Sequence, residues 1–62
     1  MIKENDKVMF SSNDKNDKTS SATVIDFVDG DIIGIRSSIH KFNIKEVSIR
    51  LLTESEIKRY FN

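Results

Sequence analysis

The second half of the chain carries the side chains best suited to binding chemistry. Basic residues recur there at short intervals, and together they form a cationic patch if the strands that carry them are neighbours. Such a patch would contact phosphate groups of a nucleic acid, and the imidazole ring of His40 would stack on a base. Its candidate residues are Arg36, His40, Lys41, Lys45 and Arg50. Glu46 interrupts this run, so an ordinary surface of mixed charge is the alternative interpretation.

Aromatic residues near the C-terminal end are the second candidate surface. Tyr60 and Phe61 are available to a protein partner there, and the polar segment Ser11–Ser21 is the other surface available to such a partner. The remaining aromatic residues are expected in the core: Phe10, Phe27 and Phe42. One tyrosine and no tryptophan make an aromatic cage for methylated lysine improbable.

Catalysis, cofactors and metal ions are not expected. The chain has no cysteine, a single histidine (His40) and no glycine-rich phosphate loop. An EF-hand count from Asp14 fails, because the sixth position is Thr19 in place of glycine and the twelfth is Ile25 in place of glutamate. A second acidic cluster is interpreted as turn chemistry, and it consists of Asp26, Asp29 and Asp31. We therefore expect a protein that is not an enzyme.

Length and composition predict a single small domain over residues 1–62. The formal net charge is zero, so no bulk electrostatic attraction draws the protein to nucleic acid or to an anionic membrane. Apolar runs are too short for a membrane span or a signal peptide. These features lead us to expect a cytoplasmic protein.

Ala22–Arg36 (ATVIDFVDGDIIGIR) is the strongest structural signal and predicts a β-hairpin. Two β-branched apolar runs flank the Asp29-Gly30 pair, a dipeptide typical of tight turns. A buried helix is the alternative, but the apolar positions do not recur at spacings of three and four.

The rest of the chain predicts short strands and a loop. Lys7–Phe10 alternates as a strand, and Ser11–Ser21 (SSNDKNDKTSS), which has no apolar residue, is expected to be a flexible loop. After a tight turn at Ser37-Ser38, Ile39–Ile44 is predicted to be a fourth strand. A single helical turn over Lys45–Val47 should place Val47 in the core, and Ser48–Leu51 is a fifth strand.

A C-terminal helix is predicted over residues 53–61. Thr53 and Glu56 have the spacing of a capping box, and Leu52 and Ile57 that of a hydrophobic staple. Ile57, Tyr60 and Phe61 fall on one face. So short a helix must dock that face, either against one end of the sheet or against another chain.

This order of elements resembles the SH3-like small barrels of the KOW and Tudor type. The residues that carry the likeness are DKVMF at 6–10, ATVIDFVDGDIIGI at 22–35 and HKFNIKEVSIRLL at 40–52. The resemblance implies a five-stranded SH3-like barrel with a short C-terminal helix. An OB-like barrel is the alternative fold, and 62 residues are few for one.

The resemblance implies an interaction module, since many unrelated functions share this fold. The chain is also similar in size, charge and composition to small accessory proteins of phages and mobile elements in low-GC bacteria, which implies that it binds and modulates a host protein. A weak nucleic-acid binder using residues 36–50 is the alternative. The protein is expected to be a monomer or a homodimer formed through the C-terminal helix.

Overall fold

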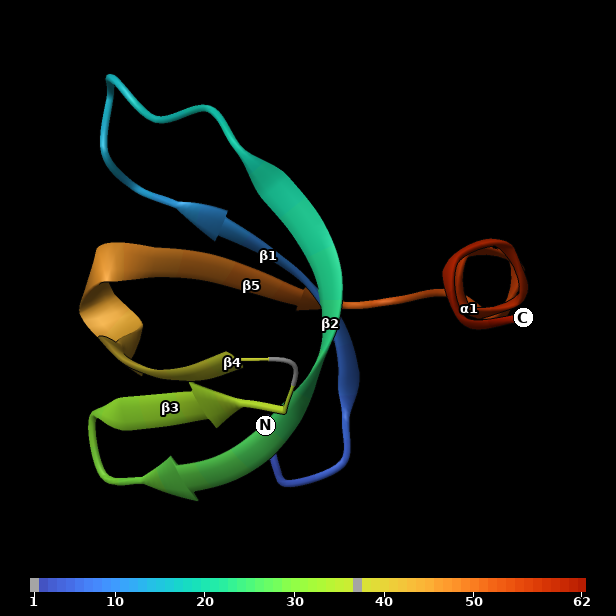
Figure 1. Cartoon of the computed structure of the whole chain (residues 1–62), viewed down its shortest axis with the longest axis horizontal. Helices are drawn as coiled ribbons and strands as arrows, with labels where there is room; N and C mark the ends of the chain where they lie inside the picture. Colours follow the sequence, from blue (N-terminus) through green and yellow to red (C-terminus); the bar gives the residue numbers. More distant parts are fainter. Residues whose placement is uncertain (1, 37) are drawn as a thin grey trace.

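Five antiparallel strands and one C-terminal helix make up the structure, a computed structural model that describes residues 2–36 and 38–62 (Figure 1). The strands are β1 (Lys7–Ser12), β2 (Ser20–Asp29), β3 (Ile32–Ile35), β4 (Ser38–Asn43) and β5 (Val47–Leu51). They form one sheet in the order β4-β3-β2-β1-β5. A 3-10 turn, η1 (Ile44–Glu46), joins β4 to β5, and α1 (Glu54–Phe61) follows β5. The predicted mainly-β class with a C-terminal helix is confirmed.

The predicted hairpin is formed by β2 and β3, which pair from Asp29 opposite Ile32 back to Ile25 opposite Ile35. Its two connecting residues are Gly30 and Asp31, one position later than the Asp29-Gly30 pair of the prediction. Gly30 has a φ of +58°, which glycine adopts without the steric cost that a Cβ would bring. A positive φ at the first connecting residue is the pattern of a type II′ turn, which suits the twist of a hairpin.

The core lies on the inner face of the curled sheet. Its buried members are Val8, Ile25, Ile33 and Val47. Val47 is in the core as predicted, because η1 ends just before it and turns the chain into β5.

Phe27 is not among the core residues, contrary to the prediction. A register shift between Ile25 and Phe27 breaks the alternation of β2, so that Val28, and not Phe27, packs against the core with Ile25. The Phe27 ring instead lies over Gly34, its partner on β3, where an added Cβ would overlap the ring. Glycine is needed at position 34 because it gives the ring this space.

The polar segment 11–21 is shorter as a loop than predicted. Strand pairing continues through Ser11 opposite Ser20, so the connection between β1 and β2 covers residues 13–19. Serine side chains do not prevent pairing, because the ladder uses backbone groups. Ser38 belongs to β4, and the other half of the predicted tight turn, Ser37, lies outside the described residues.

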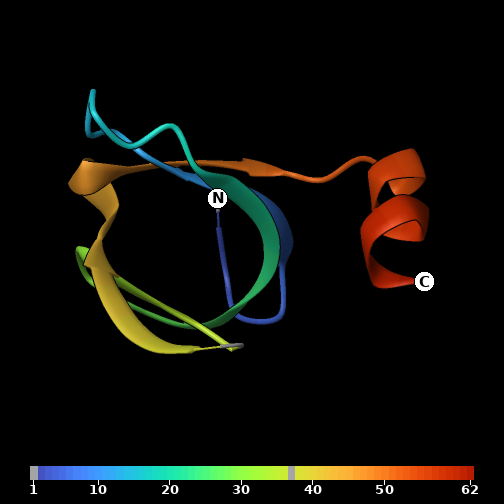
Figure 2. The ribbon, with the colours of Figure 1, turned by 45° about the horizontal axis from the view of Figure 1, so that its top comes forward.

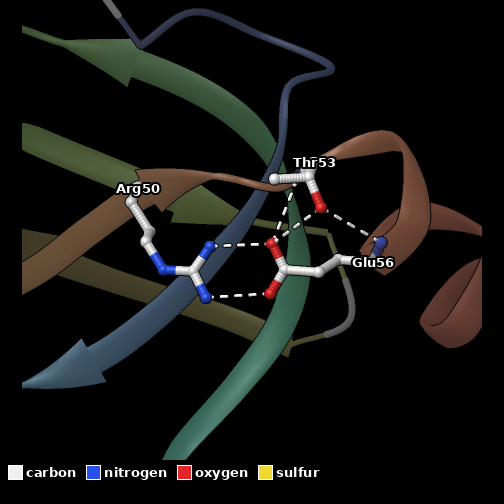
Figure 3. A network of polar contacts seen from close by, with 3 residues as sticks. All are labelled: Arg50, Thr53 and Glu56. Carbon is white, nitrogen blue, oxygen red and sulfur yellow. Dashed lines mark hydrogen bonds and ion pairs between the residues drawn. The ribbon is translucent and has the colours of Figure 1, made fainter.

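The helix α1 lies to one side of the curled sheet (Figure 2). Thr53 and Glu56 form the predicted capping box, and Glu56 also accepts two hydrogen bonds of 2.8 Å from the Arg50 guanidinium (Figure 3). Leu52 is buried and Ile57 is half-buried, as the staple spacing suggests. No helix of the described residues is long and apolar enough to cross a membrane.

Candidate functional site

A hollow of about 680 Å³ opens between the β1–β2 loop and η1. Aromatic side chains from β1 and β4 line it, as does Val47 at the start of β5. Its acidic lining residues are Asp14, Asp17 and Glu46. This hollow joins aromatic and acidic side chains, whereas a second hollow on the same loop has no aromatic lining. We call the first one the acidic pocket and treat it as the candidate site.

Phe10 and Phe42 form the aromatic part of the acidic pocket. Their ring centroids lie 4.9 Å apart with an angle of 59° between the planes, so the rings meet as two inclined walls. The rings come from β1 and β4, which are separated by β2 and β3 in the sheet order. Their contact therefore depends on the curl of the sheet that Figure 2 shows. Both rings pack against the core and remain half-buried.

Asn13 fixes the β1–β2 loop beside η1. Its backbone N–H donates to the Glu46 carbonyl at 3.0 Å, and its side-chain amide donates to the Lys45 carbonyl at 3.2 Å. The Asn13 side-chain oxygen accepts a hydrogen bond from the Ser48 hydroxyl. One asparagine thus joins the loop to η1 and β5, which positions the loop carboxylates across the pocket from Glu46.

The loop carboxylates are held by short-range turns. Asp14 accepts a hydrogen bond of 2.9 Å from the Asn16 N–H, and Asp17 accepts one of 3.0 Å from the Thr19 N–H. The Thr19 hydroxyl also donates to Asp17. The two bonds from Thr19, the hydroxyl bond first, lower the pKa of Asp17 below its usual value.

The pocket carboxylates have no cationic partner within the described part of the chain. The ion pairs there are Arg36 with Asp26 and Arg50 with Glu56. No lysine or arginine of the described residues lines the acidic pocket. Lys15 and Lys18 line a second, shallower hollow on the same loop, which Asp14 and Asp17 also border. A cation between two aromatic walls and several carboxylates is stabilised by the ring faces and by direct attraction. The acidic pocket is therefore chemically suited to a basic side chain.

The predicted basic residues are spread over the sheet. Arg50 lies on the edge strand β5, whereas His40 and Lys41 lie on the opposite edge strand, β4. Arg50 is bound by Glu56, and Arg36 lies 4.0 Å from Asp26 and also donates to the Asn5 side chain. Carboxylates thus offset both guanidiniums, and the positions of these side chains do not favour one continuous cationic patch.

The other predicted basic residues face different neighbours. The Lys41 ammonium lies 5.9 Å from the centre of the Phe27 ring. The ring centroids of His40 and Phe42 lie 5.7 Å apart. Lys45 is exposed on η1, and its carbonyl receives the Asn13 amide. Two residues of this set therefore contact lining residues of the acidic pocket: His40 through Phe42, and Lys45 through Asn13.

Tyr60 and Phe61 are both exposed on α1. The Lys7 ammonium lies 5.9 Å from the centre of the Phe61 ring, and the Arg59 guanidinium lies 5.6 Å from that of Tyr60. Both rings lie on the C-terminal helix, outside the lining of the acidic pocket. No group of three or more His, Asp or Glu side chains that could hold a metal ion occurs within residues 2–36 and 38–62.

Sequence reasoning missed the acidic pocket although it considered most of its residues. The sequence predicts Phe10 and Phe42 in the core, where they do pack, and it offers the segment Ser11–Ser21 as a partner surface without linking it to these rings. Nothing in the local spacing indicates that β1 and β4 face each other, because that contact follows from the curl of the sheet. Asn13, in a segment without apolar residues, gave no signal of its own.

The chain matches no protein-family model, no curated protein and no solved structure. The candidate site therefore rests on its own geometry.

Proposed function

We propose that the protein is a non-enzymatic interaction module that binds a basic segment of a partner protein in the acidic pocket. The observation that carries this proposal is the pocket itself, in which two aromatic walls face three carboxylates that lack a cationic partner within the described residues. A lysine or arginine side chain supplies the missing positive charge, and its aliphatic stem covers the rings.

We further propose an SH3-like small barrel as the fold. The strand order supports this assignment, as does the long β2, which pairs with both β1 and β3. The 3-10 turn between β4 and β5 and the contact of Phe10 with Phe42 across the curled sheet also support it. In such a fold, the β1–β2 loop and the β4–β5 connection lie close enough to form one binding site.

The proposal extends to the protein's setting. Its size and balanced charge agree with a small phage or mobile-element protein that binds and modulates a host protein in the cytoplasm. We do not adopt nucleic-acid binding, because the pocket is acidic and both Arg36 and Arg50 are engaged by carboxylates. A phosphate backbone would be repelled by the pocket.

A displayed library of random short peptides tests the proposed function. Peptides selected on the wild-type protein are measured again on Ser21→Tyr, which places a ring beside Phe10 because Ser21 is its cross-strand partner. Ser20→Tyr is the matched control, since the neighbouring residue lines the second hollow instead. We expect lysine- and arginine-rich peptides whose affinity falls by about tenfold or more on Ser21→Tyr, equivalent to about 1.4 kcal/mol, and is kept on Ser20→Tyr.

Two results contradict the proposed function. One is a selection that enriches no peptide above background. The other is a set of peptides that bind the Ser21→Tyr variant as well as the wild type, because these peptides would occupy another surface. Aromatic residues suit strand positions, so both variants are expected to keep the fold.

A further inference from the structure

The helix α1 is held to the sheet by few contacts. It lies beside the curled strands in both views (Figures 1 and 2), and its attachments are the Arg50–Glu56 pair and the Lys7 ammonium near Phe61. An eight-residue helix is marginally stable in water without tertiary packing. A surface that covers α1 would therefore stabilise it.

The exposed apolar side chains of the described residues gather at this end of the chain. Leu51 is 55% exposed, Tyr60 48% and Phe61 38%, and the remaining large one, Ile32, lies on β3. Leu51 ends β5 just before the helix begins, whereas Tyr60 and Phe61 occupy its last turn. Exposed apolar surface thus lies at the end of β5, before the helix, and in the last turn of α1, which is typical of an interaction site.

The charged residues of α1 are also divided between its two ends. The first turn is acidic, with Glu54 and Glu56, and the last turn is basic, with Lys58 and Arg59. Glu54 and Lys58 are four residues apart, so they lie on one side of the helix, next to the apolar face that Ile57 and Phe61 define. Arg59 points away from that side, because each residue turns the helix by about 100°.

We propose that α1 is the interface between two copies of this chain, packed antiparallel about a two-fold axis. In that arrangement Glu54 of each copy lies opposite Lys58 of the other, so both pairs attract. Tyr60 and Phe61 of one copy reach the exposed Leu51 of the other. A parallel arrangement would place like charges together, so the pattern favours the antiparallel dimer. A helix of about 12 Å buries far less than the roughly 800 Å² per partner of a standard interface, so we expect a weak dimer that forms only at high protein concentration.

Sedimentation equilibrium of the full chain tests this proposal over about 10 µM to 1 mM, a concentration range suited to a weak dimer. Glu54→Lys and Lys58→Glu each place like charges across the axis, so each variant alone should dimerise about tenfold more weakly than the wild type. An equimolar mixture of the two variants restores both attractive pairs and should recover the wild-type association. Lys15→Glu is the matched control, because it makes the same charge change in the exposed β1–β2 loop, outside α1.

The mixture separates a lost interface from a damaged fold, since two misfolded variants do not restore each other. The proposal is overturned if the wild type remains monomeric at about 1 mM. It is also overturned if the mixture associates no better than its components, or if Lys15→Glu weakens association as much as Lys58→Glu. The acidic pocket takes no part in these measurements, so its peptide binding can succeed or fail independently.

Discussion

The β1–β2 loop and the helix α1 are attached to the same sheet in different ways. The loop, residues 13–19, is tied to η1 by two hydrogen bonds from Asn13 to backbone carbonyls and to β5 by the Ser48 hydroxyl. The helix is tied by the charged pair of Arg50 and Glu56 and by the contact between Lys7 and Phe61. The loop is attached by hydrogen bonds between neutral groups, and the helix is attached by charged side chains.

This difference separates a fixed binding site from an adjustable surface. Neutral hydrogen bonds to the backbone hold across a wide range of pH and salt, so the loop keeps its carboxylates beside Phe10 and Phe42. A partly exposed ion pair weakens with salt and with acid. The loop is therefore suited to a preorganised pocket, whereas α1 can shift to meet a second copy.

The largest expected effect concerns the sheet that supports both attachments. Gly34→Ala places a Cβ inside the volume of the Phe27 ring, so the ring or the strand must move. We expect a loss of about 1–3 kcal/mol in the free energy of unfolding, typical of overpacking, measured by urea denaturation.

A double substitution isolates the cause of that loss. Adding Phe27→Ala to Gly34→Ala removes the ring that collides with the new methyl group. The double variant should therefore lose less stability than the sum of the losses in the two single variants. Strictly additive losses would show that the collision is not the cause. Both variants should weaken peptide binding and dimerisation only as far as they lower the fraction of protein that is folded.

The next effect separates the loop from the helix. Asn13→Ala removes both side-chain hydrogen bonds to η1 and β5, and we expect a loss of about 1–2 kcal/mol in stability. Hydrogen exchange should become faster in residues 13–19 and η1 while α1 is unchanged. Asn16→Ala is the matched control, because Asn16 uses its backbone N–H in the loop turn. Equal losses for the two variants would contradict the anchoring role of Asn13.

The same contrast explains which parts of the structure were predictable. The hairpin, the capping box and the burial of Val47 follow from neighbouring residues, and all were predicted. The position of Phe27 was not, because a register shift in β2 reversed the alternation that the sequence shows. Asn13 and the acidic pocket were missed since they depend on segments more than thirty positions apart. Local patterns specify elements, whereas the curl of the sheet decides which elements meet.

The smallest expected effect is confined to the helix and depends on pH. The hydrogen bonds from Arg50, followed by the Thr53 N–H, lower the pKa of Glu56 from 4.5 to about 2, and the same pairing raises the pKa of Arg50. A carboxyl whose pKa is lower in the folded than in the unfolded chain stabilises the folded protein at any pH above the unfolded-state pKa. This contribution is lost as the pH falls towards the folded-state pKa. The attachment of α1 should therefore be intact above about pH 4.5 and should weaken progressively towards pH 2.

Glu56→Gln tests this assignment because it keeps the shape of the side chain and removes the charge. The variant should show a weaker helical circular-dichroism signal at pH 7, and less of the acid-induced loss between pH 4.5 and 2 that the wild type shows. Glu54→Gln is the control for the first-turn charge, since Glu54 also lies at the positive end of the helix dipole. If both variants flatten the acid transition equally, the dipole and not Arg50 holds the helix. In that case α1 is stabilised by charges within the helix and not by a bond to β5. The helix would then differ even more from the β1–β2 loop, which Asn13 bonds to η1 and β5.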